Sequence, residues 1–294
     1  MADGNSSFEN LDRAGQATAS VVRHPRFAVN LVLALAVSLS WLVLTAMSVR
    51  NATVAPGESG PGAELLPSMP LPLPIFLEQF LQLCLTPTPV SSSLASYAAL
   101  SLMWFLMALA MMLPSAAPMI RTYCEIADTA RAKGEPVVHP LVLVAGYLLV
   151  WLAASFGFAG LSLGVQALAA TPALTPLQGM TGAAALAVAG LYQFSELKEA
   201  CLRKCRNPFT TLFSRWSTRP SRIFRLGFDQ GVWCLGCCWA LMLVMFAAGL
   251  MNVFWMALLA LFTTVEKQVD GRFPGRVAGA ILLVWAAALL LISA

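Results

Sequence analysis

The feature that most limits how this chain can fold is a series of long apolar segments with almost no charged residues. Several run for about 20 residues, enough for a helix to cross a hydrocarbon layer of about 30 Å. Apolar residues make up 59% of the chain and charged residues 11%, whereas roughly a quarter of a soluble domain is charged. The segments do not alternate apolar and polar residues as barrel strands do. The sequence therefore predicts an all-α fold, a polytopic transmembrane helical bundle.

The apolar segments predict seven spans within a single transmembrane helical domain, residues 28–294. The expected spans are residues 28–47, 94–113, 140–168, 176–194, 230–249, 252–265 and 276–293. Only the short sequence AAGLMN separates the fifth from the sixth, so six spans with one broken helix is the alternative. Residues 1–27 are small, polar and without a long apolar run, and they predict a disordered cytoplasmic tail.

The distribution of basic residues predicts the orientation of the bundle, because Lys and Arg concentrate on the cytoplasmic side of a membrane. With seven spans, all but one of the 18 Lys and Arg residues fall on one side, and the exception is Arg50. The N-terminus is therefore expected in the cytoplasm. The net charge of +4 then reflects topology, and we expect no nucleic-acid partner.

The outer loop, residues 48–93, contains many Gly, Pro and Ser residues in its first half, which is expected to be irregular. Its later sequence, PIFLEQFLQLCL, places apolar residues at helical spacing near 74–85. This pattern predicts an interfacial helix lying along the membrane surface.

Five of the seven cysteines gather in two short segments. Cys234, Cys237 and Cys238, in GVWCLGCCWALM, are spaced i, i+3 and i+4 and so share one helical face. Cys201 and Cys205 are spaced i and i+4 just after the fourth span. The expected topology brings both groups to the cytoplasmic side, where thiols stay reduced. Because soft thiolates select soft metals, the pattern predicts a shared metal site, with Cu(I) first and zinc second.

Methionines extend the same chemistry into the second span. From Met103 onward they recur at every fourth position to Met111, and Met112 adjoins them. Thioethers suit Cu(I), so Met111 and Met112, nearest the cysteine layer, are candidate ligands. Pro114 and Pro118 are expected to end this helix at the cytoplasmic boundary.

Two charged residues and one set of small residues are expected to have structural roles. Glu266 and Lys267, at the end of the sixth span, are expected to be interfacial anchors. The third span carries small residues at a spacing that favours close helix packing: Ala153, Gly157, Gly160 and Gly164. The chain lacks a P-loop, a haem-attachment motif and a nucleophile elbow, and we assign no catalytic residue.

Three sequence blocks, in order, resemble a known family. They are MALAMMLPSAAPM at 107–119, YQFSELKEACLRKCRNPF at 192–209, and GVWCLGCCWALMLVMFAAGLMNVFWMALLA at 231–260. In this combination the chain is similar to predicted metal-binding integral membrane proteins of prokaryotes, over residues 102–267. The resemblance implies a multi-pass protein of the inner membrane. It implies metal ligands at Met111, Met112, Cys201, Cys205, Cys234, Cys237 and Cys238, supported by Tyr192, Gln193 and Lys198. The chain departs from many relatives at Glu196, where they have proline; this carboxylate is either an extra ligand or a surface group.

These observations favour a membrane protein that handles Cu(I), by delivery, sequestration or transport. The expected partners are the lipid bilayer and either subunits of a membrane complex or a metallochaperone. Two alternatives stay open. In one, the protein is a non-catalytic accessory or assembly subunit whose thiols only pack. In the other, it is a membrane thiol oxidoreductase that uses the Cys-x-x-Cys pair.

Overall fold

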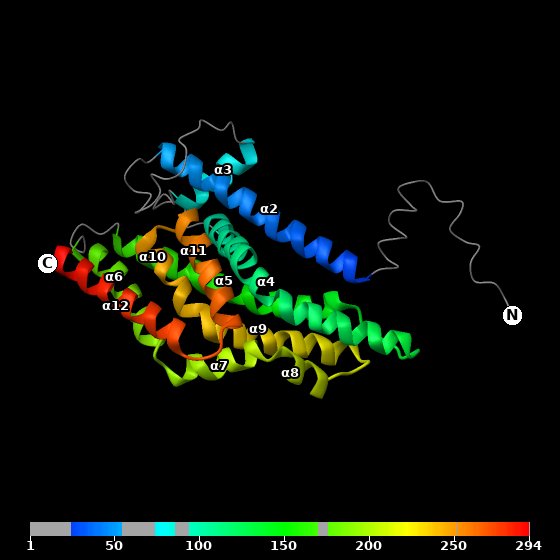
Figure 1. The fold of residues 1–294 in the computed structure, drawn as a ribbon. Helices are drawn as coiled ribbons and strands as arrows, with labels where there is room; N and C mark the ends of the chain where they lie inside the picture. Colours follow the sequence, from blue (N-terminus) through cyan, green and yellow to red (C-terminus); the bar gives the residue numbers. More distant parts are fainter. Residues whose placement is uncertain (1–24, 55–73, 86–93, 170–175, 251, 294) are drawn as a thin grey trace.

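The computed structural model of the protein describes residues 25–54, 74–85, 94–169, 176–250 and 252–293 (Figure 1). The regular structure in these residues is entirely helical, which confirms the predicted all-α class for the described part of the chain. The expected tail, apart from its last three residues, and most of the outer loop lie outside the described residues.

The helices follow one another from the N-terminal to the C-terminal end of the described chain. They are α2 (Pro25–Val54), α3 (Ile75–Leu85), α4 (Leu94–Ala132), α5 (Pro140–Ala169), α6 (Pro176–Tyr192), α7 (Glu196–Arg206), α8 (Pro208–Ser214), α9 (Pro220–Met242), α10 (Val244–Ala248), α11 (Val253–Gln268) and α12 (Phe273–Ser293). Figure 1 shows α6 and α12 side by side, and α7 and α8 connecting α6 to α9. Helix α3 coincides with the helix expected near 74–85.

All seven apolar segments are helical, but they differ in length. Five stretches are long and apolar enough to cross a membrane: α2, α4, α5, α12 and the combined stretch of α9 and α10. Helices α6 and α11 have only 17 and 16 residues. The described part of the chain thus contains five stretches of membrane-spanning length, together with two shorter helices at the positions of the fourth and sixth segments.

The fifth and sixth segments form separate helices because the backbone turns sharply at Gly249. This residue has φ of 97°, a left-handed conformation that glycine adopts without strain, and it ends α10. Asn252 then caps α11 by accepting the backbone N–H groups of Phe254 and Trp255. The chain reverses here, so that the end of α11 returns to the middle of α9.

The expectation that Pro114 and Pro118 end the second span was wrong, since α4 continues through both for 39 residues. Proline has no N–H, so Pro114 leaves the carbonyl of Ala110 without its usual helical donor. The indole Nε1 of Trp41, on α2, donates to that carbonyl at 3.1 Å. A donor from a neighbouring helix thus replaces the missing backbone bond, as is common in membrane helices.

The closest helix contact lies between α5 and α9, and glycine makes it possible. A Cβ atom on Gly227 would overlap the carbonyl oxygen of Leu143, and one on Gly146 would overlap that of Phe224. The two backbones therefore touch directly. This contact fixes the position of α9, the helix that carries three of the cysteines.

The packing face predicted on the third span was misplaced. A Cβ atom on Gly157 or Gly164 would have no described atom within 4 Å, and one on Gly160 would only reach Tyr97 at 4.0 Å. The spacing of small residues indicates which faces could pack closely, but the partner helix decides which of them does. Here the face that includes Gly146 meets α9.

Replacing Gly227 with alanine tests this contact. The added methyl group must separate α5 from α9, so we expect the free energy of unfolding to fall by about 1–3 kcal/mol despite the better helix propensity of alanine. Gly157→Ala is the matched control, because its methyl group enters open space on the same helix pair. Denaturation of both variants in detergent measures the difference. Equal stability of the two would contradict the close contact.

Candidate metal centre

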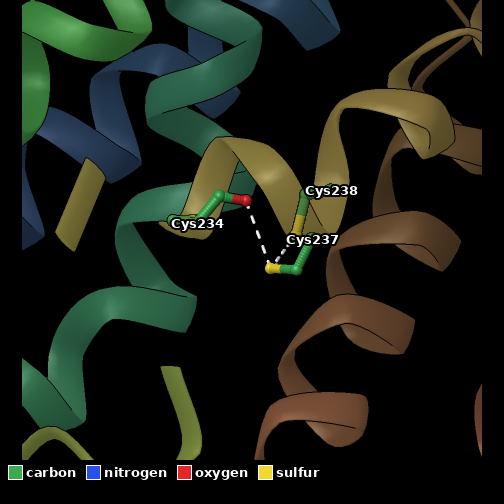
Figure 2. A group of neighbouring side chains, drawn as sticks. All are labelled: Cys234, Cys237 and Cys238. Atoms are coloured by element: carbon green, nitrogen blue, oxygen red, sulfur yellow. Dashed lines mark hydrogen bonds between the residues drawn. The ribbon is translucent and has the colours of Figure 1, made fainter. Parts of the chain in front are cut away.

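Three thiols of α9 form a compact buried group. The sulfur atoms of Cys234, Cys237 and Cys238, here called the thiol triad, all lie within 4.8 Å of one another. The sulfurs of Cys237 and Cys238 are 3.2 Å apart, and each of the three residues is at most 3% exposed. Figure 2 shows the Cys237 sulfur pointing to the backbone carbonyl of Cys234, to which its thiol donates at 3.1 Å. The i, i+3, i+4 spacing thus produces the shared face that the sequence predicted.

A fourth thiol reaches the triad from α7. Ser195 caps this helix by accepting the backbone N–H of Lys198, and glutamates in its first turn suit the positive end of the helix dipole. Helix α7 packs on α9. This packing brings the Cys205 sulfur to 4.0 Å from that of Cys237. Two helices that are separated in the sequence therefore supply thiols to one place.

Cys201 also faces α9, but its sulfur packs against the helix backbone. A Cβ atom on Gly236 would lie 2.6 Å from the Cys201 sulfur. The glycine within the Cys-x-x-Cys sequence therefore makes room for the neighbouring helix. Burial raises the pKa of the Cys201 thiol above its usual value, so this thiol stays protonated at neutral pH.

The predicted methionine ligands lie in the neighbouring layer of the core. Met111 and Met112 are fully buried on α4. The carbonyl of Met112 accepts the hydroxyl of Tyr147 at 3.2 Å, and the same hydroxyl lies 3.1 Å from the Cys234 sulfur. Met112 is thus connected to the triad through one tyrosine.

The geometry of the thiols fits a soft metal ion. Two sulfurs bound to one ion are separated by at most twice the metal–sulfur distance, which gives about 4.6 Å for a bond of about 2.3 Å. The distances from Cys237 to Cys238 and to Cys205 are within this limit. Among the described residues, the group identified by its spacing consists of thiols alone. Such a donor set suits Cu(I) or zinc rather than a hard cation.

Lys267 is turned toward the triad, so the expectation that it anchors the protein at the interface was wrong. Its Nζ lies 3.1 Å from the Cys234 sulfur and donates to the Ser115 hydroxyl at 2.7 Å. An ammonium group in this position stabilises a thiolate. The sequence signal was an ionisable residue at the end of an apolar helix, which is a functional candidate by default.

Glu266, the residue before Lys267, is also buried rather than interfacial. Its carboxylate pairs with the Lys198 ammonium at 2.8 Å, and the two side chains are only 2% and 3% exposed. Lys198 also donates to the side-chain carbonyl of Gln193. Two of the residues that the family resemblance marks as supporting, Gln193 and Lys198, therefore meet here, and the pair of Lys198 with Glu266 joins α7 to α11.

Further polar contacts hold α7 in place. Arg206 donates to the backbone carbonyls of Glu266 and Gly271. Glu196 accepts two hydrogen bonds from Arg272, each at 2.8 Å, and these bonds lower the pKa of its carboxyl group. Glu196 is exposed and forms an ion pair with Arg272, which favours its interpretation as a surface group.

A cavity of about 270 Å³ leads toward the thiols. We call it the access cavity. Its inner wall includes Ser115, Tyr147, Cys205, Gln230, Cys234 and Lys267, and its outer wall includes the exposed residues Asn207, Gln268 and Asp270.

The fold and the site define a class: an all-helical protein with helices of membrane-spanning length and a buried thiol group suited to a soft metal. Residues 101–289 match the family PpoB2, described as a copper chaperone, and the chain belongs to that family. The match covers α4 from its second turn through most of α12, and so includes every candidate ligand. It supports the link to copper that the sequence suggested. No curated protein and no solved structure matches the chain.

Removing the Lys198 ammonium tests the buried ion pair. Lys198→Met leaves the Glu266 carboxylate buried without a counter-charge, so the free energy of unfolding should fall by about 3–5 kcal/mol. The double variant Lys198→Met, Glu266→Leu should regain much of this loss. Denaturation in detergent measures both. Arg272→Met, which breaks the exposed pair with Glu196, is the control and should change stability little. Equal effects at the two pairs would contradict a structural role for the buried one.

Proposed function

We propose that the protein is an integral membrane copper chaperone that holds Cu(I) on the buried thiol triad of α9. The observation that carries this proposal is the thiol triad, three sulfurs gathered in an apolar interior of a chain from a copper chaperone family. Cys205 adds a fourth sulfur at bridging distance. The set of candidate ligands widens to Cys201, Met111 and Met112, which lie in the adjoining helix layers.

The donor set favours Cu(I) over zinc. Structural zinc sites are almost always tetrahedral and closed by four protein ligands, whereas the triad offers three. Thiolates and thioethers both bind Cu(I), and the methionine-rich layer of α4 adjoins the triad through Tyr147. A closed zinc site would need Cys205 as its fourth ligand, so zinc is the second choice of metal.

Each neighbouring group has a separate task in this proposal. Burial of the triad keeps water and oxidants away from a bound ion. The Lys267 ammonium offsets the negative charge that ionised thiols bring into the interior. Tyr147 holds the Cys234 side chain in place from α5.

The membrane location is supported by five helices of sufficient length and apolarity. The shorter α6 and α11 would complete seven spans, with the N-terminus in the cytoplasm. Arg26, at the start of α2, pairs with Asp128 near the end of α4, so the basic ends of these two helices lie together. We place the protein in the inner membrane of a prokaryote, where it would pass copper to a membrane complex or exchange it with a metallochaperone.

The purified protein should bind about one Cu(I) per chain through sulfur alone. The double variant Cys237→Ser, Cys238→Ser should lower the Cu(I) affinity by at least about 100-fold, since even outer partners of metal ligands cost up to that much. Anaerobic competition with bicinchoninate measures the affinity, and X-ray absorption identifies the bound atoms.

Cys124→Ser is the matched control, because Cys124 is a buried thiol on α4 outside the site. It should leave Cu(I) binding unchanged. Replacement of Met111 and Met112 by leucine tests the wider ligand set. If these methionines bind copper, X-ray absorption of the variant should show the loss of a long copper–sulfur contact. Unchanged copper content in the double cysteine variant would reject the proposed site.

A further inference from the structure

One of the four clustered thiols differs from the others in its exposure. The triad is buried, whereas Cys205 is partly exposed and lines the access cavity. The outer wall of this cavity is formed by exposed polar residues, so solvent reaches it. Cys205 is therefore the most exposed of the clustered thiols, and a molecule that arrives through the cavity can contact it.

Cys234 also lines the cavity, but a positive charge lies beside its sulfur. The Lys267 ammonium lies 3.1 Å from its sulfur and is held there by Ser115. A cation that approached Cys234 directly would meet this positive charge, and like charges at short range repel strongly in a partly dry site. The approach through Cys205 avoids that encounter.

From Cys205 the next sulfur is close. Cys237 lies 4.0 Å away, and Cys238 lies a further 3.2 Å beyond it. Both distances are short enough for two sulfurs to hold one ion at the same time, as ligand exchange requires. The thiols thus form a continuous path from the cavity to the buried triad.

We propose that Cys205 is the exchange thiol through which Cu(I) enters and leaves the triad. This inference rests on the proposed function. In each step a new copper–sulfur bond forms as the bond to the preceding ligand breaks. Copper stays Cu(I), so no electron moves. The first proton, from Cys205, goes to solvent in the cavity; the Cys237 proton passes to the Cys205 sulfur as that sulfur is released.

The rates of copper transfer test this role. Loading from a bicinchoninate complex and removal by bathocuproine disulfonate are followed by stopped flow, without oxygen, on the full-length protein in detergent. Cys205→Ser should slow both processes by about tenfold or more while the bound copper per chain stays the same. Loss of an ordinary ligand would instead speed removal, so slower removal is the distinguishing result.

Cys124→Ser is the matched control. Cys124 is a buried thiol on α4 that lies outside the thiol triad and is not part of the cavity wall. Its replacement should leave both rates within about twofold of the wild type. Rates in Cys205→Ser equal to the wild type, or faster removal, would overturn the inference while leaving the proposed function intact. A wild-type protein that binds no Cu(I) would instead overturn the proposed function.

A second measurement covers the case in which Cys205→Ser does not fold. Iodoacetamide is added to the wild-type protein, and the modified cysteines are located by mass spectrometry. Among the six cysteines whose side chains the structure describes, Cys205 should react first, and blocking it should slow copper loading by a similar factor. Earlier reaction of a triad cysteine, or loading unaffected by the block, would reject Cys205 as the exchange thiol.

Discussion

The arrangement of the site depends on the buried ion pair between Lys198 and Glu266. Lys198 belongs to the helix that carries Cys205, and Glu266 precedes the lysine that contacts Cys234. The pair therefore positions α7 and the end of α11 together. Two opposite charges removed from water stabilise each other only when both are present and well placed. The ion pair thus joins the two helices through buried charges, and the hydrogen bonds from Arg206 to the Glu266 carbonyl add to it.

The thiols lie close together because of small residues as well as this ion pair. Gly236 allows α7 to approach α9, and the glycines between α5 and α9 bring those backbones into contact. Tyr192 adds a hydrogen bond to the Gly236 carbonyl at 2.5 Å. Helices α5, α6 and α7 are therefore held close against α9.

Much of this could be predicted from the sequence, because it follows from local periodicity. The length of the apolar segments predicted the helices. The i, i+3, i+4 spacing of Cys234, Cys237 and Cys238 predicted the helical face that they share. The errors all involve partners distant in the chain. Trp41 replaces the donor that Pro114 lacks, and Glu266 is buried because Lys198 reaches it. A single sequence does not show which residue of another helix will meet a given position.

The direct backbone contact between α5 and α9 has a mechanical consequence. A helix that touches its neighbour at Gly227 and Gly146 cannot slide or rotate without driving a side chain into a carbonyl oxygen. The triad is therefore held in a fixed position relative to α5. Exposure of the thiols by a rotation of α9 against α5 is disfavoured, whereas the proposed transfer of copper from sulfur to sulfur needs no such movement.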